Sequence, residues 1–339
     1  MIVWLALALL QGAPIGPDNA SRVKQIATLK GHEMPVFGLA VSADGKWLAS
    51  AGIDKTVRVW NLAEERQARL FSHERQAIAV AFRPDGSTIV SAGYEPTIRT
   101  WDFTSGKAVD LQKESTTKDQ YLQIRTVNVH FSPDGSLLAS TLEGSCQVFL
   151  WDVKTRAQKE LMTVRDATEV FSRVAFSADG KWMAAQHEMP RGGKSTIEMW
   201  NLKDEKWTGT LAGPDKVCYS NEAIALNADG TKAACVDVRT SDIHMWDVKS
   251  GKPGPALRGH KHDSNEQLLI LSLAFNADST VIASASYDET LRLWEVATGK
   301  QLAELPVPKG GAASAVFSPD GRMIATAGLN GSIQIWGVR

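Results

Sequence analysis

Two short markers recur along nearly the whole chain, with successive copies of the second marker 41 to 50 residues apart. The first is a turn with aspartate in third place, at Asp44, Asp85, Asp134, Asp179, Asp229, Asp278 and Asp320. The second is a tryptophan, at Trp60, Trp101, Trp151, Trp200, Trp246, Trp294 and Trp336. The aspartate precedes the tryptophan by 16 or 17 residues in six units and by 21 in the fourth. Such a period indicates repeated supersecondary units that bury their surfaces by stacking on one another.

Each unit predicts three strands and an outer fourth. In the first unit, "VFGLAV" alternates and ends at the turn "SADG", where Asp and Gly suit a tight reversal. "KWLASAG" follows, and a short turn leads into "TVRVW", which is rich in β-branched residues. Outer strands are expected at "QARLF", "GPALR" and "QLAEL". The chain is therefore predicted to be all-β, with seven four-stranded antiparallel sheets.

With its turn aspartates and its Trp-Asp or Trp-Asn pairs in register, the chain resembles the WD40-repeat family over roughly residues 25 to 338. The resemblance implies a closed seven-bladed β-propeller. The last unit stops after its third strand, in "IQIWGVR", whereas the unused strand "QIATLKGH" lies at residues 25–32. We therefore expect the N-terminal strand to complete the last blade, with residues 1–20 as an apolar segment and linker and 21–339 as the propeller.

The resemblance also implies buried tetrads, in which a tryptophan indole N–H, a hydroxyl, a histidine and a turn carboxylate form a hydrogen-bond chain. Three units supply all four members: His32, Ser50, Asp54 and Trp60; His73, Ser91, Glu95 and Trp101; His260, Ser284, Asp288 and Trp294. The seventh unit keeps Thr326, Asn330 and Trp336 but has Pro308 and Lys309 near the histidine position. Units 3, 4 and 5 keep the tryptophan and lose the histidine.

Ser50, His32 and Asp54 also have the composition of a hydrolase triad. A triad is needed once, beside an oxyanion hole and a cleft. Here the set occurs three times, each time tied to a tryptophan at fixed spacing. Buried indole and hydroxyl groups need partners, because an unmade bond costs about 1–3 kcal/mol. We therefore expect a structural role and no catalytic residue.

Binding is expected at the top face, where the connections into the first strands and the turns between the second and third strands meet. Loops that grow on one face of a repeat scaffold are often its binding face. The residue before each turn carboxylate is apolar or aromatic, and longer loops add further candidates; the expected binding residues are Ile53, Tyr94, Tyr121, Arg191, Tyr219, Tyr287 and Leu329. The alternatives are drift in unconstrained loops and ordinary isolated apolar residues.

Composition excludes several other functions. The formal net charge of −1 gives no electrostatic reason to bind nucleic acid. Three scattered cysteines predict neither a disulfide framework nor a zinc site. His260 and His262 with Asp263 suggest a metal, but the tetrad already uses His260, so no metal or other cofactor is expected. No segment after the N-terminus is long and apolar enough to span a membrane, and a monomer is expected.

The resulting hypothesis is a non-catalytic scaffold that binds a protein or peptide through its top face. The alternative is an exported propeller enzyme, a hydrolase or lactonase-like protein, with a site in the central channel. That site would need polar groups on the first strands, which are mostly small and apolar, with only His130 interrupting them.

The N-terminus opens with nine apolar residues, Ile2 to Leu10, followed by small residues. This pattern is typical of a signal peptide, although no Lys or Arg precedes it and "QGAP" is a poor cleavage site. We expect an extracytoplasmic protein, periplasmic in a bacterium or secreted. The alternatives are a cytoplasmic protein with an apolar tail, or a misassigned start.

Overall fold

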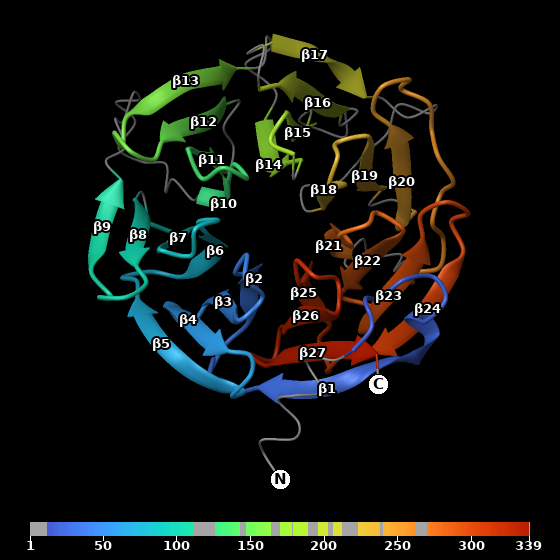
Figure 1. Cartoon of the computed structure of the whole chain (residues 1–339), viewed down its shortest axis with the longest axis horizontal. Coiled ribbons are helices and arrows are strands. Elements are labelled where there is room, and N and C mark those ends of the chain that lie inside the picture. The colour runs from blue at the N-terminus through green and yellow to red at the C-terminus, as the bar shows by residue number, and fades with distance from the viewer. Residues whose placement is uncertain are drawn as a thin grey trace.

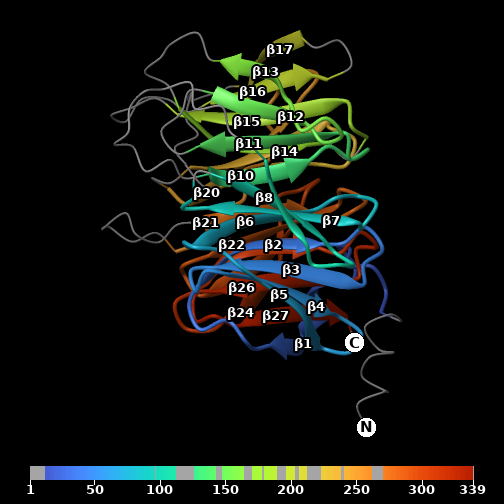
Figure 2. The same cartoon turned by 90° about the vertical axis from the view of Figure 1, so that its left-hand side faces the viewer.

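The computed structural model describes residues 12–95, 97–111, 126–142, 147–163, 170–177, 179–188, 196–202, 206–211, 223–237, 240–261 and 270–338. Within these residues, the strands form seven antiparallel sheets arranged as blades around an axis (Figure 1). Seen from the side, the blades form a disc with two faces, and the strands run across it (Figure 2). The sequence prediction of an all-β, seven-bladed propeller is confirmed.

Blades 1 and 2 consist of β2 (Val36–Val41), β3 (Trp47–Gly52), β4 (Thr56–Asn61) and β5 (Arg66–Ser72), and of β6 (Ala77–Phe82), β7 (Thr88–Gly93), β8 (Ile98–Asp102) and β9 (Ala108–Leu111). Blades 3 and 4 consist of β10 (Thr126–Phe131), β11 (Leu137–Leu142), β12 (Gln147–Asp152) and β13 (Gln158–Thr163), and of β14 (Val170–Phe176), β15 (Trp182–Glu188), β16 (Thr196–Asn201) and β17 (Lys206–Leu211). Blade 5 consists of β18 (Ile224–Leu226), β19 (Lys232–Asp237) and β20 (Asp242–Asp247).

Blade 6 consists of β21 (Ile270–Phe275), β22 (Val281–Ser286), β23 (Thr290–Glu295) and β24 (Gln301–Pro306). Blade 7 joins β25 (Ala312–Phe317), β26 (Met323–Gly328) and β27 (Ile333–Val338) to β1 (Val23–Leu29), which follows the short 3₁₀ helix η1 (Ala20–Arg22).

The two ends of the chain close the ring. Strand β1 pairs antiparallel with β27, with Gln25 opposite Trp336 and Leu29 opposite Ile333. Figure 1 shows β1 lying along the outside of β27 as the fourth strand of the last blade. The expected closure by the N-terminal strand is confirmed, and no covalent link between the ends is needed.

The core lies between neighbouring blades, where the middle strands bury small and β-branched side chains. Ala49, Ala51, Val57 and Val59 of blade 1 are completely buried against blade 2. At Gly38 on β2, an added Cβ would lie 2.9 Å from the carbonyl oxygen of Ile78 on β6. Glycine therefore lets the inner strands approach closely near the axis.

The turn aspartates of the repeat lie on the face that we call the bottom. In blade 1, the Ser42 hydroxyl donates to Asp44 Oδ1 (2.6 Å), which also accepts the backbone N–H of Lys46 (3.1 Å). The Ser42 oxygen in turn accepts the N–H of Trp47 (3.0 Å). These bonds satisfy the backbone at the reversal between the first and second strands, which explains why the aspartate recurs.

The segment before β1 packs onto the bottom face of blades 6 and 7. Ile15 is 1% exposed and belongs to the core cluster of these blades, together with Ala20. Its backbone N–H donates to the Gly321 carbonyl (2.8 Å), and its carbonyl accepts the side-chain amide of Asn276 (2.9 Å). We call residues 12–19 the N-terminal strap. The sequence interpretation treated residues 1–20 as an apolar segment and linker, and it did not anticipate that the strap packs against the propeller.

One expected strand is missing. The segment "GPALR" (Gly254–Arg258) was predicted to be the outer strand of blade 5, but it makes only two isolated bridges to β20, Trp246 to Pro253 and Ile243 to Leu257. Pro253 and Pro255 have no N–H to donate, so a regular ladder cannot form between the bridges.

The cysteine interpretation also needs correction at one position. Cys235 on β19 is disulfide-bonded, whereas the scattered cysteines predicted no disulfide framework. The spacing of three scattered cysteines does not show which thiols pair.

Candidate functional site

The tetrad of blade 1 forms as the resemblance implied. Trp60 Nε1 donates to Ser50 Oγ (2.9 Å), and Ser50 Oγ lies 2.7 Å from His32 Nε2. His32 Nδ1 lies 2.9 Å from Asp54 Oδ2, and Thr56 Oγ1 donates to the other carboxylate oxygen (2.7 Å). The network assigns the proton of the imidazole to Nδ1, so that the serine hydroxyl donates to Nε2.

Blade 6 repeats this geometry. Trp294 Nε1 donates to Ser284 Oγ (2.8 Å), which lies 2.6 Å from His260 Nε2. His260 Nδ1 lies 2.8 Å from Asp288 Oδ2. All four side chains are buried, so the chain of bonds satisfies polar groups that water does not reach.

Blade 2 departs from the pattern at its last link. Trp101 and His73 both bond Ser91 Oγ at 2.7 Å. His73 Nδ1, however, lies 3.4 Å from Glu95 Oε1 and makes no hydrogen bond. The longer glutamate side chain instead accepts the backbone N–H of Arg75 at 2.9 Å. The predicted chain of hydrogen bonds therefore stops at His73 in this blade.

Blades 3 and 7, which lack the histidine, keep the hydrogen bond between the tryptophan and the hydroxyl. Trp151 donates to Ser140 (3.1 Å) and Trp336 donates to Thr326 (2.9 Å). In blade 5, the strand register puts Cys235 at the serine position, and Trp246 Nε1 is buried with no hydrogen-bond partner among the described residues. Ser140 could be missed in the sequence because it lies 11 residues before its tryptophan instead of 10.

An arginine extends two of the tetrads, and the sequence interpretation missed it. Arg58 Nε donates to Thr56 Oγ1 (3.2 Å), and its Nη1 donates to Gln67 on the outer strand (2.7 Å). Arg292 of blade 6 makes the corresponding bonds to Thr290 and Gln301 at 3.1 and 2.7 Å. The signal was the arginine shared by "TVRVW", "TIRTW" and "TLRLW", the three units that carry a histidine.

Close packing around this arginine explains why glycine precedes the tetrad histidine in blades 1 and 6, at Gly31-His32 and Gly259-His260. A Cβ added at Gly31 would lie 2.7 Å from Arg58 Nη1 and 2.9 Å from the Trp60 ring. Real Cβ atoms do not approach other atoms so closely, so a larger residue at this position would displace the guanidinium or the indole.

Burial and hydrogen bonding set the ionisation of these groups. Burial lowers the pKa of His32, against the opposing effect of Asp54. Burial also lowers the pKa of His73, against the effect of Glu95. Burial alone would raise the pKa of Asp54, but hydrogen bonds from Thr56 and His32 outweigh it and hold the pKa below its ordinary value. The tetrad of blade 1 is therefore built around a neutral histidine and an ionised carboxylate.

The serine of the tetrad is a poor candidate nucleophile. Ser50, Ser91 and Ser284 are each completely buried, and each oxygen is held between a tryptophan and a histidine. A nucleophile needs access to substrate and a nearby oxyanion site. This arrangement joins the second and third strands to the Gly-His segment, and its chemistry is that of a structural network.

The four described residues of the predicted top-face set share one position and one environment. Ile53, Tyr94, Tyr287 and Leu329 each precede the turn carboxylate or Asn330 and are half-buried. The backbone N–H of Ile53 donates to the Pro35 carbonyl at 2.9 Å, which ties this turn to the entry of β2. Tyr121, Arg191 and Tyr219 lie outside the described residues.

Met34 lies next to this rim and was not singled out from the sequence. It is 47% exposed and precedes Pro35, the residue that accepts the bond from Ile53. An added Cβ at Gly331 of blade 7 would lie 3.1 Å from the Met34 carbonyl oxygen. Met34 therefore lies at the junction of blades 7 and 1, between the rim positions Leu329 and Ile53.

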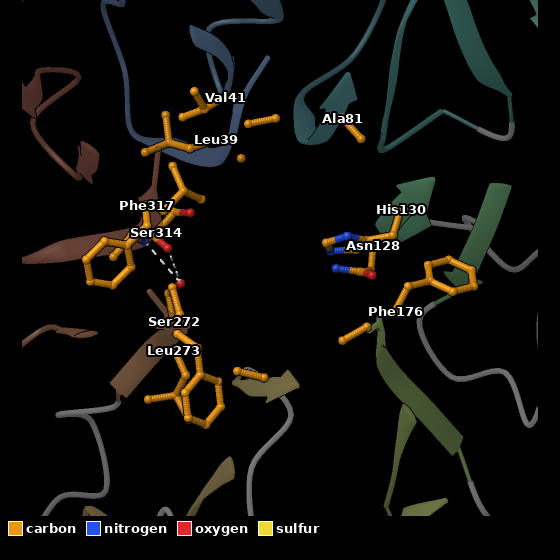
Figure 3. Close-up of a pocket in the computed structure, with 18 of the residues that line it drawn as sticks. Leu39, Val41, Ala81, Asn128, His130, Phe176, Ser272, Leu273, Ser314 and Phe317 are labelled. Atoms are coloured by element: carbon orange, nitrogen blue, oxygen red, sulfur yellow. Dashed lines mark hydrogen bonds between the residues drawn. The ribbon is translucent and has the colours of Figure 1, made fainter. Parts of the chain in front are cut away.

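The inner strands line a central channel of about 670 Å³. Figure 3 shows Asn128 and His130 of β10 on one side and Ser272, Ser314 and Phe317 on the other. The Ser272 hydroxyl oxygen accepts the N–H of Ala315 at 3.1 Å and thereby links blades 6 and 7. The expectation that only His130 interrupts the apolar first strands is therefore wrong, because Asn128, Ser272 and Ser314 also line the channel.

Metal and membrane sites have no support within the described residues. No group of three His, Cys, Asp or Glu side chains there could hold a metal ion. His260 serves its tetrad, and His262 and Asp263 of the metal hypothesis lie outside the part of the chain that the structure describes. No described helix has the length and apolar character needed to cross a bilayer.

Comparison with known proteins gives a family match over more than half of the chain. The family model described as "WD domain, G-beta repeat" matches residues 23–61, 64–102, 117–152, 251–295 and 299–337. These matches cover blades 1, 2, 3, 6 and 7, and the first match begins with strand β1, which closes the ring. Blades 4 and 5, which lack the histidine, complete the ring in the structure.

Three curated relatives are informative. The periodic tryptophan protein 2 homolog of Schizosaccharomyces pombe is 30% identical over 38% of this chain and 14% of its own length. The apoptotic protease-activating factor 1 of Rattus norvegicus is 24% identical over 94% of this chain and 23% of its own length. The WD repeat-containing protein 26 homolog of Arabidopsis thaliana is 27% identical over 91% and 50% respectively. The chain spans half or less of each of these relatives.

The expected extracytoplasmic location in a bacterium is wrong on this comparison, because these relatives are proteins of eukaryotes. The signal-peptide interpretation relied on an apolar run without the preceding positive charge that distinguishes a signal peptide from another apolar stretch. Residues 1–11 lie outside the described residues.

Proposed function

Because the chain belongs to the WD40-repeat family, we propose that it is a non-catalytic scaffold that binds a protein or peptide through its top face. The observation that carries the proposal is the rim of half-buried apolar and aromatic side chains at Ile53, Tyr94, Tyr287 and Leu329. The tetrads beneath that rim are buried and hold its turns in place. A rigid platform with partly exposed aromatic groups is suited to anchoring a partner at low entropic cost.

Met34 and the charged groups around the rim complete the proposed surface. Met34 is 47% exposed, and unbranched methionine adapts to differently shaped apolar partners. Glu33, Lys55 and Glu74 are exposed nearby and carry both signs of charge. This mixture favours a protein or peptide over a polyanion.

The proposed scaffold acts as a monomer and does not bind nucleic acid. The formal net charge of −1 supports the second part, because nonspecific nucleic-acid binding depends on neutralising many phosphates. Light scattering on the purified chain and fluorescence anisotropy with labelled duplex DNA at low salt test both parts. A dimer mass would contradict the first, and saturable DNA binding would contradict the second.

The top-face proposal is tested by affinity capture with the intact propeller and a Tyr94→Ala/Tyr287→Ala variant. We expect the double variant to lose the partner of the wild-type chain while keeping its melting temperature. The matched control is Leu70→Ala, which shortens an apolar side chain that is 49% exposed on the outer strand β5, away from the top face. Unchanged capture by the double variant, or loss in the control, would place the site elsewhere.

A further inference from the structure

A pocket of about 260 Å³ lies at the junction of blades 5 and 6. Its apolar walls are Met245 and Trp246 of β20, Pro255 of the irregular outer segment and Val296 of blade 6. Met245, Trp246 and Val296 are at most 5% exposed. The pocket lies away from the central channel and shares no residue with the top-face rim.

The junction of blades 1 and 2 shows what fills the corresponding space elsewhere. There, the Trp47 ring packs edge-on against Phe103, with ring centroids 5.1 Å apart. Arg69 of the outer strand reaches across and donates to the carbonyl oxygens of Phe103 (3.4 Å) and Thr104 (3.2 Å). Two aromatic rings and a guanidinium thus close that junction.

The strand register identifies the counterparts of these three residues at the pocket. Trp47 lies opposite Asn61, as Lys232 lies opposite Asp247. The two bridges of blade 5 put Pro255 opposite Met245, as Arg69 lies opposite Val59.

The third counterpart follows from chain order, since Val296 follows the Trp-Glu pair of blade 6 as Phe103 follows the Trp-Asp pair of blade 2. Lysine, proline and valine therefore replace tryptophan, arginine and phenylalanine. These replacements leave space of about the size of an aromatic group, which the described residues do not fill.

Positive charges outnumber negative charges among the described residues that line the pocket. Lys232 is half-buried and Lys252 is exposed, and both contribute to the lining. Among the described lining residues, the one carboxylate is Asp247, and its Oδ1 accepts the backbone N–H and the hydroxyl of Ser250 at 2.8 and 2.6 Å. An anionic group at the mouth would meet two ammonium groups, and an apolar group would fill the interior.

We propose that this pocket is a binding site for an aromatic or branched aliphatic group that carries a carboxylate. The apolar group lies between Met245, Pro255 and Val296, and the carboxylate faces Lys232 and Lys252. The same chemistry belongs to a small aryl or alkyl carboxylic acid and to the C-terminus of a peptide that ends in an apolar residue. The site goes beyond the proposed top-face function and does not depend on it.

The test measures binding of 3-phenylpropionate and of its neutral isostere 3-phenylpropan-1-ol to the full chain, by saturation-transfer NMR and calorimetry. We expect saturable binding of the carboxylate and binding of the alcohol weaker by about tenfold, which corresponds to about 1.4 kcal/mol. Val296→Phe restores the residue type of the filled junction and should abolish binding of both probes. Lys232→Gln/Lys252→Gln should remove the preference for the carboxylate.

Two further variants keep the test decisive. Lys249→Gln removes a lysine outside the pocket lining and should leave both affinities unchanged. Pro255→Arg fills the space from the other wall and serves if Val296→Phe does not fold, as judged by its melting curve. Absence of saturable binding by the wild-type chain, or wild-type affinity in a folded filled variant, would overturn the proposal.

The two sources of the carboxylate are separated with a tripeptide, acetyl-Gly-Gly-Phe, as free acid and as C-terminal amide. Binding of the acid and not the amide, lost in the filled variant, assigns the site to peptide C-termini. Binding of 3-phenylpropionate without binding of either peptide assigns it to small carboxylic acids. Equal binding of acid and amide would contradict the role of the carboxylate.

Discussion

At the scale of single residues, the repeated Ser-His-acid sets join strands and are not arranged for chemistry. The evidence for this structural role is the hydrogen bond that each tryptophan donates to the serine of its own set. Trp60, Trp101 and Trp294 donate to the same serine oxygen that the histidine contacts, at 2.7 to 2.9 Å. Since that oxygen is buried and engaged on both sides, its removal affects folding stability directly.

Ser50→Ala and Ser284→Ala are each expected to lower the free energy of unfolding by about 1–3 kcal/mol, because each leaves an indole N–H and an imidazole nitrogen buried without a partner. Urea denaturation followed by fluorescence measures the change. Ser21→Ala, at an exposed position of η1, is the matched control and should have no measurable effect. Wild-type stability in both tetrad variants would contradict the structural role.

The tetrads also predict that the stability of the fold depends on pH. Since the pKa of His32 and of His73 is lowered from 6.5 in the fold, protonation below pH 6.5 favours the unfolded chain. Stability is therefore fully present above 6.5 and is lost as pH falls toward the folded pKa values. We expect the melting temperature to fall between pH 7 and pH 5. A His32→Gln/His73→Gln variant should be less stable at pH 7 and show a shallower fall.

The carboxylates act in a lower range of pH. The pKa of Asp54 is held below 3.8 by hydrogen bonds that outweigh burial, so its contribution is present above pH 3.8 and is lost as pH falls further. The fall between pH 7 and pH 5 thus reports on the histidines. A fall of equal size in the double histidine variant would contradict the assignment.

At the scale of elements, the N-terminal strap before β1 contacts both of the last two blades and holds them together, and we call this contact the latch. Ile15 lies in their core, and its backbone bonds to Gly321 on one side and to Asn276 on the other. Asn276 occupies the position that Ser42 has in blade 1. The Ser42 hydroxyl donates within its own turn, to Asp44, whereas the Asn276 side-chain amide donates to the Ile15 carbonyl outside the turn. The replacement of serine by asparagine is thereby explained for blade 6.

Ile15→Ala is expected to lower the free energy of unfolding by about 2–5 kcal/mol, because it leaves a cavity in the core of blades 6 and 7. Thermal and urea unfolding measure this loss. Pro14→Ala, a change at the exposed neighbour, is the control. If both variants were as stable as the wild-type chain, the strap would contribute nothing to the latch.

At the scale of the whole molecule, stability depends on closing the ring. Strand β1 buries Val23, Ala27 and Leu29 and covers the edge of β27. Without it, blade 7 would expose a strand edge that invites pairing with another chain. Closure joins the ends of the sequence by hydrogen bonds and apolar packing, so both ends contribute to one cooperative unit.

Two truncations separate the latch from the closure. Deletion through Asp18 removes Ile15 and is expected to destabilise the fold measurably, while the ring stays closed. Deletion through Lys30 also removes β1 and is expected to destabilise it far more and to promote aggregation. Melting curves and light scattering compare the two. Equal melting of both truncations would contradict closure by β1.

The sequence alone predicted the blade number and the closure, because each depends on a pattern that recurs along the chain. The family resemblance implied the twelve tetrad positions, and eleven of them join the hydrogen-bond chains, whereas Glu95 makes no hydrogen bond to His73. Only the tertiary structure revealed the latch at Ile15 and the pocket beside Val296. These depend on contacts between residues far apart in the chain, and no spacing encodes them.

The same reason explains the errors: a proline-containing outer segment and a cysteine at a serine position look ordinary in a repeat until the strands are paired. A repeat specifies what its units share, whereas packing across the ring decides what each unit does differently.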